Sequence, residues 1–533
     1  MAGPSFVGAT PKGVVFFVCN KRYDSRKRDC VILRRTVELW ATLLSALLAV
    51  PQLVRAYAGP DPELASGMDS ILASPALEGA TVGLLVIRLS DGQILYAKDP
   101  DTPMIPASNM KLISTAAVLS YLRPDYRFHT DVYGPAPEGG RIAGDLVIRG
   151  YGDPYLTPER MWYLANRIHF LDVNEITGDI VVDDTYFDGP RLANGWEQDL
   201  SSAAYMAPVG AVSVGSNALM IHVFPSPIPD GDARIVFDPP SDYPQIHGRI
   251  RTVDAGRTSI SVDLVPFQDR SQVKVAGRIL ATDPGHAFWR RVDNPPVYAG
   301  EILKNLLARS QVHVTGKVRT GPVPAGVEPI LTVTSPTLGE LVGSTNRNSN
   351  NFMADQLARV LGAARYGAPG NWTKAQAAIE AFLTEEVGVD RKAFVIGNAS
   401  GLHDVNRMTP RAVIAVLTYM DRHSNLSPEY ISSLAIAAGT GTLRDRMKES
   451  DAAYLLRAKT GTLSIASALS GYVALKSGER VAFSMIVNDY KQPIEEIWSV
   501  QDQFGATLAG WRLFGGAQNH VATAVAPAAG NHP

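Results

Sequence analysis

Apolar runs near both ends of the chain predict two β-hairpins. Toward the N-terminal end, residues 81–89 and 93–98 read as strands on either side of the turn sequence Ser90-Asp91-Gly92. Far along the chain, residues 466–475 and 480–487 form a second pair around a short polar turn. Because the two hairpins come from opposite ends of the chain, we predict one antiparallel sheet that both ends close, as in an α+β domain.

Helical periodicity occupies the stretches between these hairpins. Apolar residues at i, i+3 and i+4 predict amphipathic helices over residues 108–122 and 351–361. The first is expected to stop at Arg123-Pro124, because proline does not continue a helix. A last helix is predicted from about residue 495 to 513. We expect the helices to cover the sheet.

The middle of the chain has a different amino-acid composition. Residues 134–335 are rich in Pro, Gly and short Val/Ile runs such as 142–149 and 176–182, which predict mostly β-structure. This region interrupts the α+β domain, so we interpret it as an insertion of two subdomains. The domain itself would then comprise residues 59–133 and 336–517.

The N-terminal segment, residues 1–58, predicts an export signal. Its apolar run over residues 39–50 follows several Lys and Arg residues and is too short to cross a bilayer. Ala56-Tyr57-Ala58 provides the small-x-small pattern that signal peptidase accepts, so we expect an extracytoplasmic chain that begins near Gly59. The alternative is an uncleaved anchor, which would also export the chain.

The cysteine positions and the net charge exclude several kinds of binding site. Both cysteines, Cys19 and Cys30, precede the predicted cleavage point, so we expect neither a disulfide nor a thiolate metal site in the mature chain. The net charge of -2, from 50 basic and 52 acidic residues, provides no field that gathers nucleic acid. We predict no metal, no cofactor and no nucleic-acid partner, and the sequence leaves the oligomeric state open. The Ala/Pro-rich residues 518–533 predict a disordered tail.

Three short motifs occur in order along the chain. They are Ser108-Asn109-Met110-Lys111, Ser349-Asn350-Asn351 and Lys459-Thr460-Gly461. Each is weak alone, since Ser271-Gln272-Val273-Lys274 also fits the first pattern and Ser344-Thr345-Asn346 the second. Ser271 lies in an alternating stretch, where Lys274 would face the opposite side of a strand, so we interpret it as a chance match. Ser108 begins a predicted helix, which places Lys111 on the same face one turn away.

A serine nucleophile that has no histidine partner needs a nearby amine to accept its proton. Lys111 can accept the Ser108 proton only if burial or a second cation lowers its pKa, and Lys459 is a candidate for that cation. The helix N-terminus at Ser108 also favours an oxyanion. Ser349 and Asn351 begin the next helix and provide a second wall.

Gly461, on an expected edge strand, leaves room for a ligand backbone. The structural alternatives are N-caps at Ser108 and at Ser349 or Asn350, with Asp355 in the first turns, and a solvated edge position for Lys459. None of these alternatives requires the three motifs together.

The ordered trio resembles that of penicillin-binding proteins and class A β-lactamases. The spacing of 241 positions from Ser108 to Ser349 (349 − 108) exceeds what a compact β-lactamase accommodates. The chain therefore resembles the class C low-molecular-mass penicillin-binding proteins, the D-alanyl-D-alanine carboxypeptidase/endopeptidase family of serine peptidase clan SE. Supporting matches are Gly152-Asp153-Pro154-Tyr155-Leu156, Phe187-Asp188, Gly195-Trp196, Tyr205-Met206-Ala207-Pro208 and Ser400-Gly401-Leu402. The resemblance implies a transpeptidase-like fold, an antiparallel sheet flanked by helices.

The resemblance also implies roles for the motif residues. Ser108 would be the nucleophile, Lys111 its general base, and Ser349 the donor of a proton to the leaving amine. Backbone N–H groups of Ser108 and Thr462 would hold the oxyanion. The residues implied to bind the substrate at its carboxylate end are Lys459, Thr460, Gly461 and Thr462. Peptidoglycan stem peptides are the implied substrates and β-lactams the covalent inhibitors.

One segment departs from the family pattern. The usual Asp-Gly-Ser-Gly-Leu-Ser is here Asn398-Ala399-Ser400-Gly401-Leu402-His403, and we expect the change to affect substrate preference. Two other functions would use part of the same pattern. A β-lactamase would need a dedicated deacylating base, for which the sequence offers no candidate, and a non-catalytic binding or sensing module would not need the Ser108–Lys111 pair. The balance between carboxypeptidase and endopeptidase activity is left open.

Overall fold

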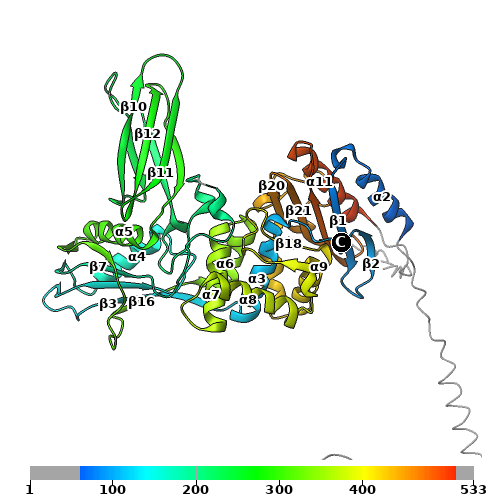
Figure 1. Ribbon diagram of the computed structural model, residues 1–533, viewed down its shortest axis with the longest axis horizontal. Helices are drawn as coiled ribbons and strands as arrows, with labels where there is room; N and C mark the ends of the chain where they lie inside the picture. The colour runs from blue at the N-terminus through cyan, green and yellow to red at the C-terminus, as the bar shows by residue number, and fades with distance from the viewer. Residues whose placement is uncertain (1–60, 200, 512–533) are drawn as a thin grey trace, which may run out of the picture. The chain divides into compact units, whose positions relative to one another are not determined.

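The computed structural model describes residues 61–199 and 201–511 (Figure 1). The predicted leader, with both cysteines and the cleavage point after Ala58, lies outside the described residues, as does the predicted tail at 518–533. Among the helices that are described, none combines the length and the apolar character needed to span a bilayer.

Strands from both ends of the chain form a six-stranded antiparallel sheet. In spatial order they are β19 (Ala435–Ile436), β20 (Leu456–Leu463), β21 (Ala466–Ala474), β22 (Arg480–Asn488), β1 (Thr81–Arg88) and β2 (Ile94–Lys98). β1 pairs with β2 on one side and with β22 on the other. Both predicted hairpins, their closure into one sheet and the α+β class are confirmed.

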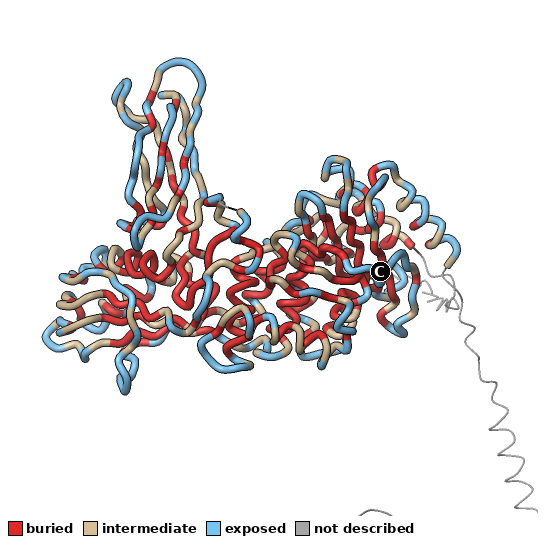
Figure 2. Tube along the Cα trace, viewed as in Figure 1, coloured by how far each residue is buried: buried red, intermediate tan, exposed pale blue. Residues whose placement is uncertain are grey.

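Helices cover both faces of this sheet, which explains why β1 is apolar at every position from Leu84 to Ile87. Leu84 and Val86 pack in the cluster that includes α2 (Pro62–Leu72) and α11 (Ile494–Gly510). The alternate residues, Leu85 and Ile87, belong to the cluster built around α3. A strand buried on both faces has a continuous apolar run instead of an alternating one. Figure 2 shows the strands and helices of these layers as largely buried.

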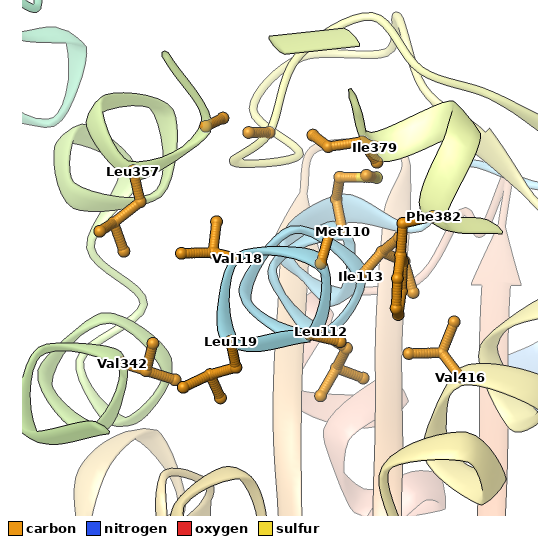
Figure 3. Packing of buried hydrophobic residues seen from close by; sticks show 14 of the residues in the cluster. Met110, Leu112, Ile113, Val118, Leu119, Val342, Leu357, Ile379, Phe382 and Val416 are labelled. Atoms are coloured by element: carbon orange, nitrogen blue, oxygen red, sulfur yellow. The ribbon is translucent and has the colours of Figure 1, made fainter. Parts of the chain in front are cut away.

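The helix that follows Ser108, α3 (Met110–Leu122), is central rather than amphipathic. Every residue from Met110 to Leu119 is buried, and Figure 3 shows its apolar side chains meeting those of neighbouring helices on several sides. Those neighbours are α6 (Leu338–Arg347), α7 (Asn351–Tyr366), α8 (Trp372–Ala381) and α9 (Pro410–Arg422). The prediction of an amphipathic helix is wrong for α3, because a helix surrounded by others has no polar face over that length. α7 is buried as well, but its buried residues include polar side chains such as Asp355 and Arg359.

Residues between β3 and β16 form separate sheets. One is five-stranded, in the order β15 (Val318–Thr320), β7 (Ile180–Asp183), β5 (Leu146–Gly150), β3 (Arg127–Tyr133) and β16 (Leu331–Thr337). Its parallel pairs, β5 with β7 and β7 with β15, are connected through α4 (Pro158–His169) and α5 (Pro295–Arg309), since parallel neighbours need a crossover.

The runs predicted as strands at 142–149 and 176–182 are each split. Their first residues form β4 (Arg141–Ile142) and β6 (Glu175–Ile176), which join β14 (His313–Val314) in a small parallel sheet. The break falls at Gly144 and Gly178, whose backbones approach too closely for a side chain on Gly178. A glycine inside an apolar run therefore divided it.

Two three-stranded sheets complete this region. One has the order β13 (His286–Arg291), β8 (Ala218–Phe224), β9 (Arg234–Asp238), and the other β10 (Pro244–Val253), β12 (Arg270–Leu280), β11 (Ser259–Phe267). Among the described strands, none between β3 and β16 joins the six-stranded sheet. We propose that this segment is an inserted region of two subdomains.

Candidate active site

Ser108 lies in a tight turn immediately before α3. The turn, Ala107–Asn109, is a single 3₁₀ turn, and Ala107 adopts the left-handed conformation with φ 46°. Ser108 is half-buried, whereas its neighbours Ala107 and Asn109 are fully enclosed. The side chain of Asn109 donates to Ser470 Oγ at 2.6 Å, which ties the turn to β21. Packing of its neighbours therefore positions the one hydroxyl that stays accessible.

Lys111 Nζ makes three contacts in a fully buried position. It lies 3.0 Å from Ser108 Oγ, 2.7 Å from Asn351 Oδ1 and 2.7 Å from the Ser400 carbonyl oxygen. Burial lowers the pKa of Lys111 to about 7, against the opposing effect of the Asp355 carboxylate. An appreciable fraction of this amine is therefore neutral near neutral pH.

The partners of Lys111 determine where its lone pair points. Asn351 Nδ2 donates to the Tyr205 carbonyl oxygen at 3.2 Å, so Asn351 turns its Oδ1 toward Lys111. Oδ1 and the Ser400 carbonyl can only accept, so they take both N–H groups of a neutral lysine. The lone pair of Lys111 Nζ is then directed at Ser108 Oγ. This arrangement can receive the serine proton.

Asn351 and Ser349 reach the site from the start of α7. Asn350 caps that helix, with its side chain accepting from Met353 N at 3.0 Å, and Ser349 has φ 54°. Of the capping alternatives, the one at Asn350 is correct, and it leaves the side chains of Ser349 and Asn351 free to face α3 and β20.

Lys459 is buried on β20, so the alternative of a solvated edge residue is wrong. Its Nζ donates to Ser349 Oγ at 2.9 Å and to the Thr460 carbonyl oxygen at 2.8 Å. Burial, and then the neighbouring Lys111 cation, hold the pKa of Lys459 well below its usual range. For Lys111 the main cause is burial, rather than the second cation that the sequence suggested. Two buried amines this close disfavour simultaneous protonation.

The outer edge of β20 is only partly covered. β19 pairs with Arg457 and Ala458, and among the described strands none pairs with β20 on that side from Lys459 onward. Thr460 is half-buried and its hydroxyl donates to Thr442 Oγ1 at 2.7 Å, while Thr462 is exposed. The edge-strand prediction holds for this half of β20.

Gly461 lies against the turn that carries Ser108. A Cβ atom there would lie 2.9 Å from Ala107 Cβ and 3.0 Å from Ser108 N. The missing side chain therefore makes room for the Ser108 turn of the chain itself.

We expect Gly461→Ala to displace the Ser108 turn and to lower the rate of acylation by penicillin about 10²-fold, as small misplacements of reacting groups do. Stopped-flow or gel measurement of labelling checks this. The matched control is Gly67→Ala in α2, where the added methyl meets only the Thr507 side chain at 3.3 Å. Equal rates for both variants would show that the Gly461 contact does not position Ser108.

Asp355 is the residue that sequence reasoning missed as part of the site. It is fully buried on α7, one turn after Asn351, and its Oδ1 accepts from Ala399 N at 2.8 Å. Burial raises its pKa to about 6. Asp355 thereby connects α7 to the segment whose Ser400 carbonyl binds Lys111. Its i+4 spacing from Asn351 was the available signal.

Hydrogen bonds of the Asn398 side chain hold the loop that departs from the family pattern. Asn398 Oδ1 accepts from Gly401 N at 2.8 Å and from Asn406 Nδ2 at 3.1 Å. Gly401 has φ 78°, and a side chain there would collide with the Ala107 carbonyl. The replaced position Asn398 therefore still holds the loop against the Ser108 turn.

Both duplicate motifs contribute residues to the interior of the fold, and the predicted strand placement of Ser271 is confirmed. Ser271 is buried in β12 and donates to Asp293 Oδ2 at 2.9 Å, while Lys274 is exposed on the opposite face. Asn346 of the second duplicate is buried in α6 and donates to Ser433 Oγ at 2.8 Å. Throughout residues 61–199 and 201–511, no group of three or more His, Cys, Asp or Glu side chains is placed to hold a metal ion.

Known proteins resemble this chain over most of its length. The model of the D-Ala-D-Ala carboxypeptidase 3 (S13) family matches residues 64–507. A D-alanyl-D-alanine carboxypeptidase of Actinomadura sp. (strain R39) is 32% identical over 490 residues, which cover 87% of this chain and 90% of the relative. The D-alanyl-D-alanine carboxypeptidase DacB of Haemophilus influenzae is 24% identical over 417 residues, covering 78% and 86% of the two chains.

The fold is shared as well. The crystal structure of penicillin binding protein 4 from Haemophilus influenzae has a TM-score of 0.71 at 22% identity, covering 83% of this chain and 98% of that one. The family match includes both the six-stranded sheet and the segment from β3 to β16.

Proposed function

This chain belongs to the D-Ala-D-Ala carboxypeptidase 3 (S13) family, the class C low-molecular-mass penicillin-binding proteins, and we propose that its serine carboxypeptidase activity uses Ser108 as nucleophile. The observation that supports this most is the 3.0 Å distance from Ser108 Oγ to a buried lysine amine whose other partners are acceptors. A helix cap or a binding module has no use for such an amine.

The proposed acylation begins with proton transfer from Ser108 Oγ to neutral Lys111. The Ser108 oxygen then attacks the carbonyl carbon between the two terminal D-alanines, and backbone N–H groups of Ser108 and Thr462 stabilise the oxyanion. The C–N bond breaks, and Ser349 passes a proton to the departing amine while it takes one from Lys459 Nζ, 2.9 Å away. Water then attacks the acyl-serine ester, Lys111 returns its proton to the departing Ser108 oxygen, and the proton that the water loses restores Lys459.

Recognition of the substrate is assigned to β20. Lys459 with Thr460 and Thr462 would bind the terminal carboxylate, and the open edge from Lys459 to Leu463 would align the peptide. A β-lactam presents an amide beside a carboxylate in the same way, so it would acylate Ser108. We place this reaction outside the cytoplasm, where peptidoglycan is found, with a cleaved signal before Gly59.

We also propose DD-endopeptidase activity, supported by the absence of a described strand along that edge of β20, which would leave space for a second stem peptide. Purified protein should remove one D-alanine from a disaccharide pentapeptide and should open a cross-linked dimer, both detected by mass spectrometry. Ser108→Ala protein is the control and should leave both substrates intact. Cleavage of the pentapeptide alone would limit the function to carboxypeptidase, and cleavage of neither would refute the proposal.

A further inference from the structure

The sheet of β10, β12 and β11, labelled in Figure 1, has one apolar face and one polar face. Ile250, Val262 and Val275 are buried in the same cluster as Leu219 and Ile221 of β8, so this face packs inward. Residues at the intervening positions point to the other side of each strand. These positions form the outward face of the sheet.

The outward face carries a group of cations. Arg249 and Arg251 lie on β10, and Lys274 and Arg278 lie on β12, all four with exposed side chains and all at the positions that alternate with the buried ones. We call these four residues the basic face. In the strand register Arg251 is opposite Arg278, and Lys274 is opposite His247. The chain as a whole has a net charge of -2, so this positive charge is a local concentration.

The cations of the basic face are unpaired. Across the described residues, no carboxylate lies within ion-pair distance of any of the four. The acid opposite Lys274 is Asp263, which accepts instead from Ser202 Oγ at 3.5 Å. Arg278 makes one hydrogen bond, from Nε to the Arg257 carbonyl at 3.1 Å, which leaves its charge uncompensated. Arg251 and Arg278 are neighbours on parallel strands, and Asp232, which lies opposite Arg251 across an isolated bridge on the other side of β10, makes no ion pair with either arginine.

The geometry of the strands suits an extended anion. Cations two residues apart on one strand are separated by about 6.6 Å, and neighbouring strands by about 4.8 Å, so charges can be met at several successive points. We propose that the basic face binds a linear polyanion that bears phosphate groups, with the arginines contacting phosphate oxygens in pairs. This surface is separate from Ser108 and would hold the peptidase on an anionic matrix.

The neighbours of the cations favour a polymer over a lipid surface. In the three rows of the register that contain the basic face, the other outward residues are His247, Asp263, Asp232, Ser261, Ala276 and Ser259. All are polar or small. A surface that inserts into a membrane combines basic residues with large apolar anchors, which these rows lack.

Binding of linear polyphosphate to the full chain, measured by titration calorimetry, tests the proposal. The basic-face variant combines Arg249→Gln, Arg251→Gln, Lys274→Gln and Arg278→Gln, and should bind about tenfold or more weakly, with a shallower dependence of affinity on salt. The matched control removes the same charges elsewhere, from exposed and unpaired residues: Arg309→Gln, Lys392→Gln, Arg422→Gln and Arg444→Gln. It should stay within about twofold of the wild type.

Two further arms separate the alternatives. A charge-preserving variant with lysine at Arg249, Arg251 and Arg278 should retain most of the affinity, and all variants should be acylated by penicillin like the wild type, which shows that they are folded. An equal loss of affinity in the control variant, or no binding of polyphosphate by the wild type, would overturn the proposal. Binding of phosphatidylglycerol vesicles or of polyglutamate in preference to polyphosphate would overturn it in favour of a membrane or a carboxylate polymer.

Discussion

Ser108→Ala protein is expected to take up no fluorescent penicillin, whereas the wild type is labelled stoichiometrically. Only a serine with a base in contact forms the acyl ester, and Ser108 Oγ has Lys111 Nζ at 3.0 Å. Labelling is read by gel fluorescence and by the mass of the intact protein. Persistence of the added mass over time would also exclude a β-lactamase, which would release the acyl group quickly.

Ser271→Ala is the control for this experiment, because Ser271 begins the duplicate motif but is buried against Asp293 in β12. It should be labelled like the wild type. Labelling that survives Ser108→Ala and disappears in Ser271→Ala would identify Ser271 as the nucleophile instead of Ser108.

The second large effect is expected for Lys111→Met, which removes the amine and keeps the volume of the side chain. Acylation by penicillin and by peptide should fall by about 10² to 10⁴, the usual consequence of losing a general base. The wild-type rate should rise with pH as Lys111 loses its proton around its pKa of about 7, and the variant should lack that rise. Lys274→Met, from the duplicate motif, should behave like the wild type because Lys274 is exposed and remote from any serine hydroxyl of its own motif.

Stability provides an independent readout for Lys111. Its pKa is lowered in the folded state from 10.5 to about 7, so between these values the unfolded chain binds more protons and the folded protein becomes more stable as pH rises. At pH 7 the buried amine costs stability, and Lys111→Met should raise the free energy of unfolding by up to a few kcal/mol. Denaturant titrations at pH 7 and pH 10 check this. A variant that is both inactive and less stable at pH 7 would indicate a structural role for Lys111 instead.

The local pattern of apolar and turn residues was sufficient to predict part of the fold. The two hairpins were predictable because turn residues separate apolar runs at either end, and their closure followed from the chain order. Local pattern could not predict the breaks at Gly144 and Gly178 or the complete burial of α3. Each of these features depends on which other segment of the chain packs alongside.

For the site, the sequence by itself determined the candidates and their order: a helical i, i+3 spacing is a local property, so Ser108 and Lys111 share a face wherever that helix lies. It also separated Ser108 from Ser271, because a strand turns Lys274 away. The tertiary structure alone decided the rest. Asp355, the Ser400 carbonyl and the contact between Gly461 and the Ser108 turn come from segments far apart in sequence. The pKa of Lys111 likewise depends on burial, which no single segment can provide, because desolvation requires surrounding elements to exclude water from the amine.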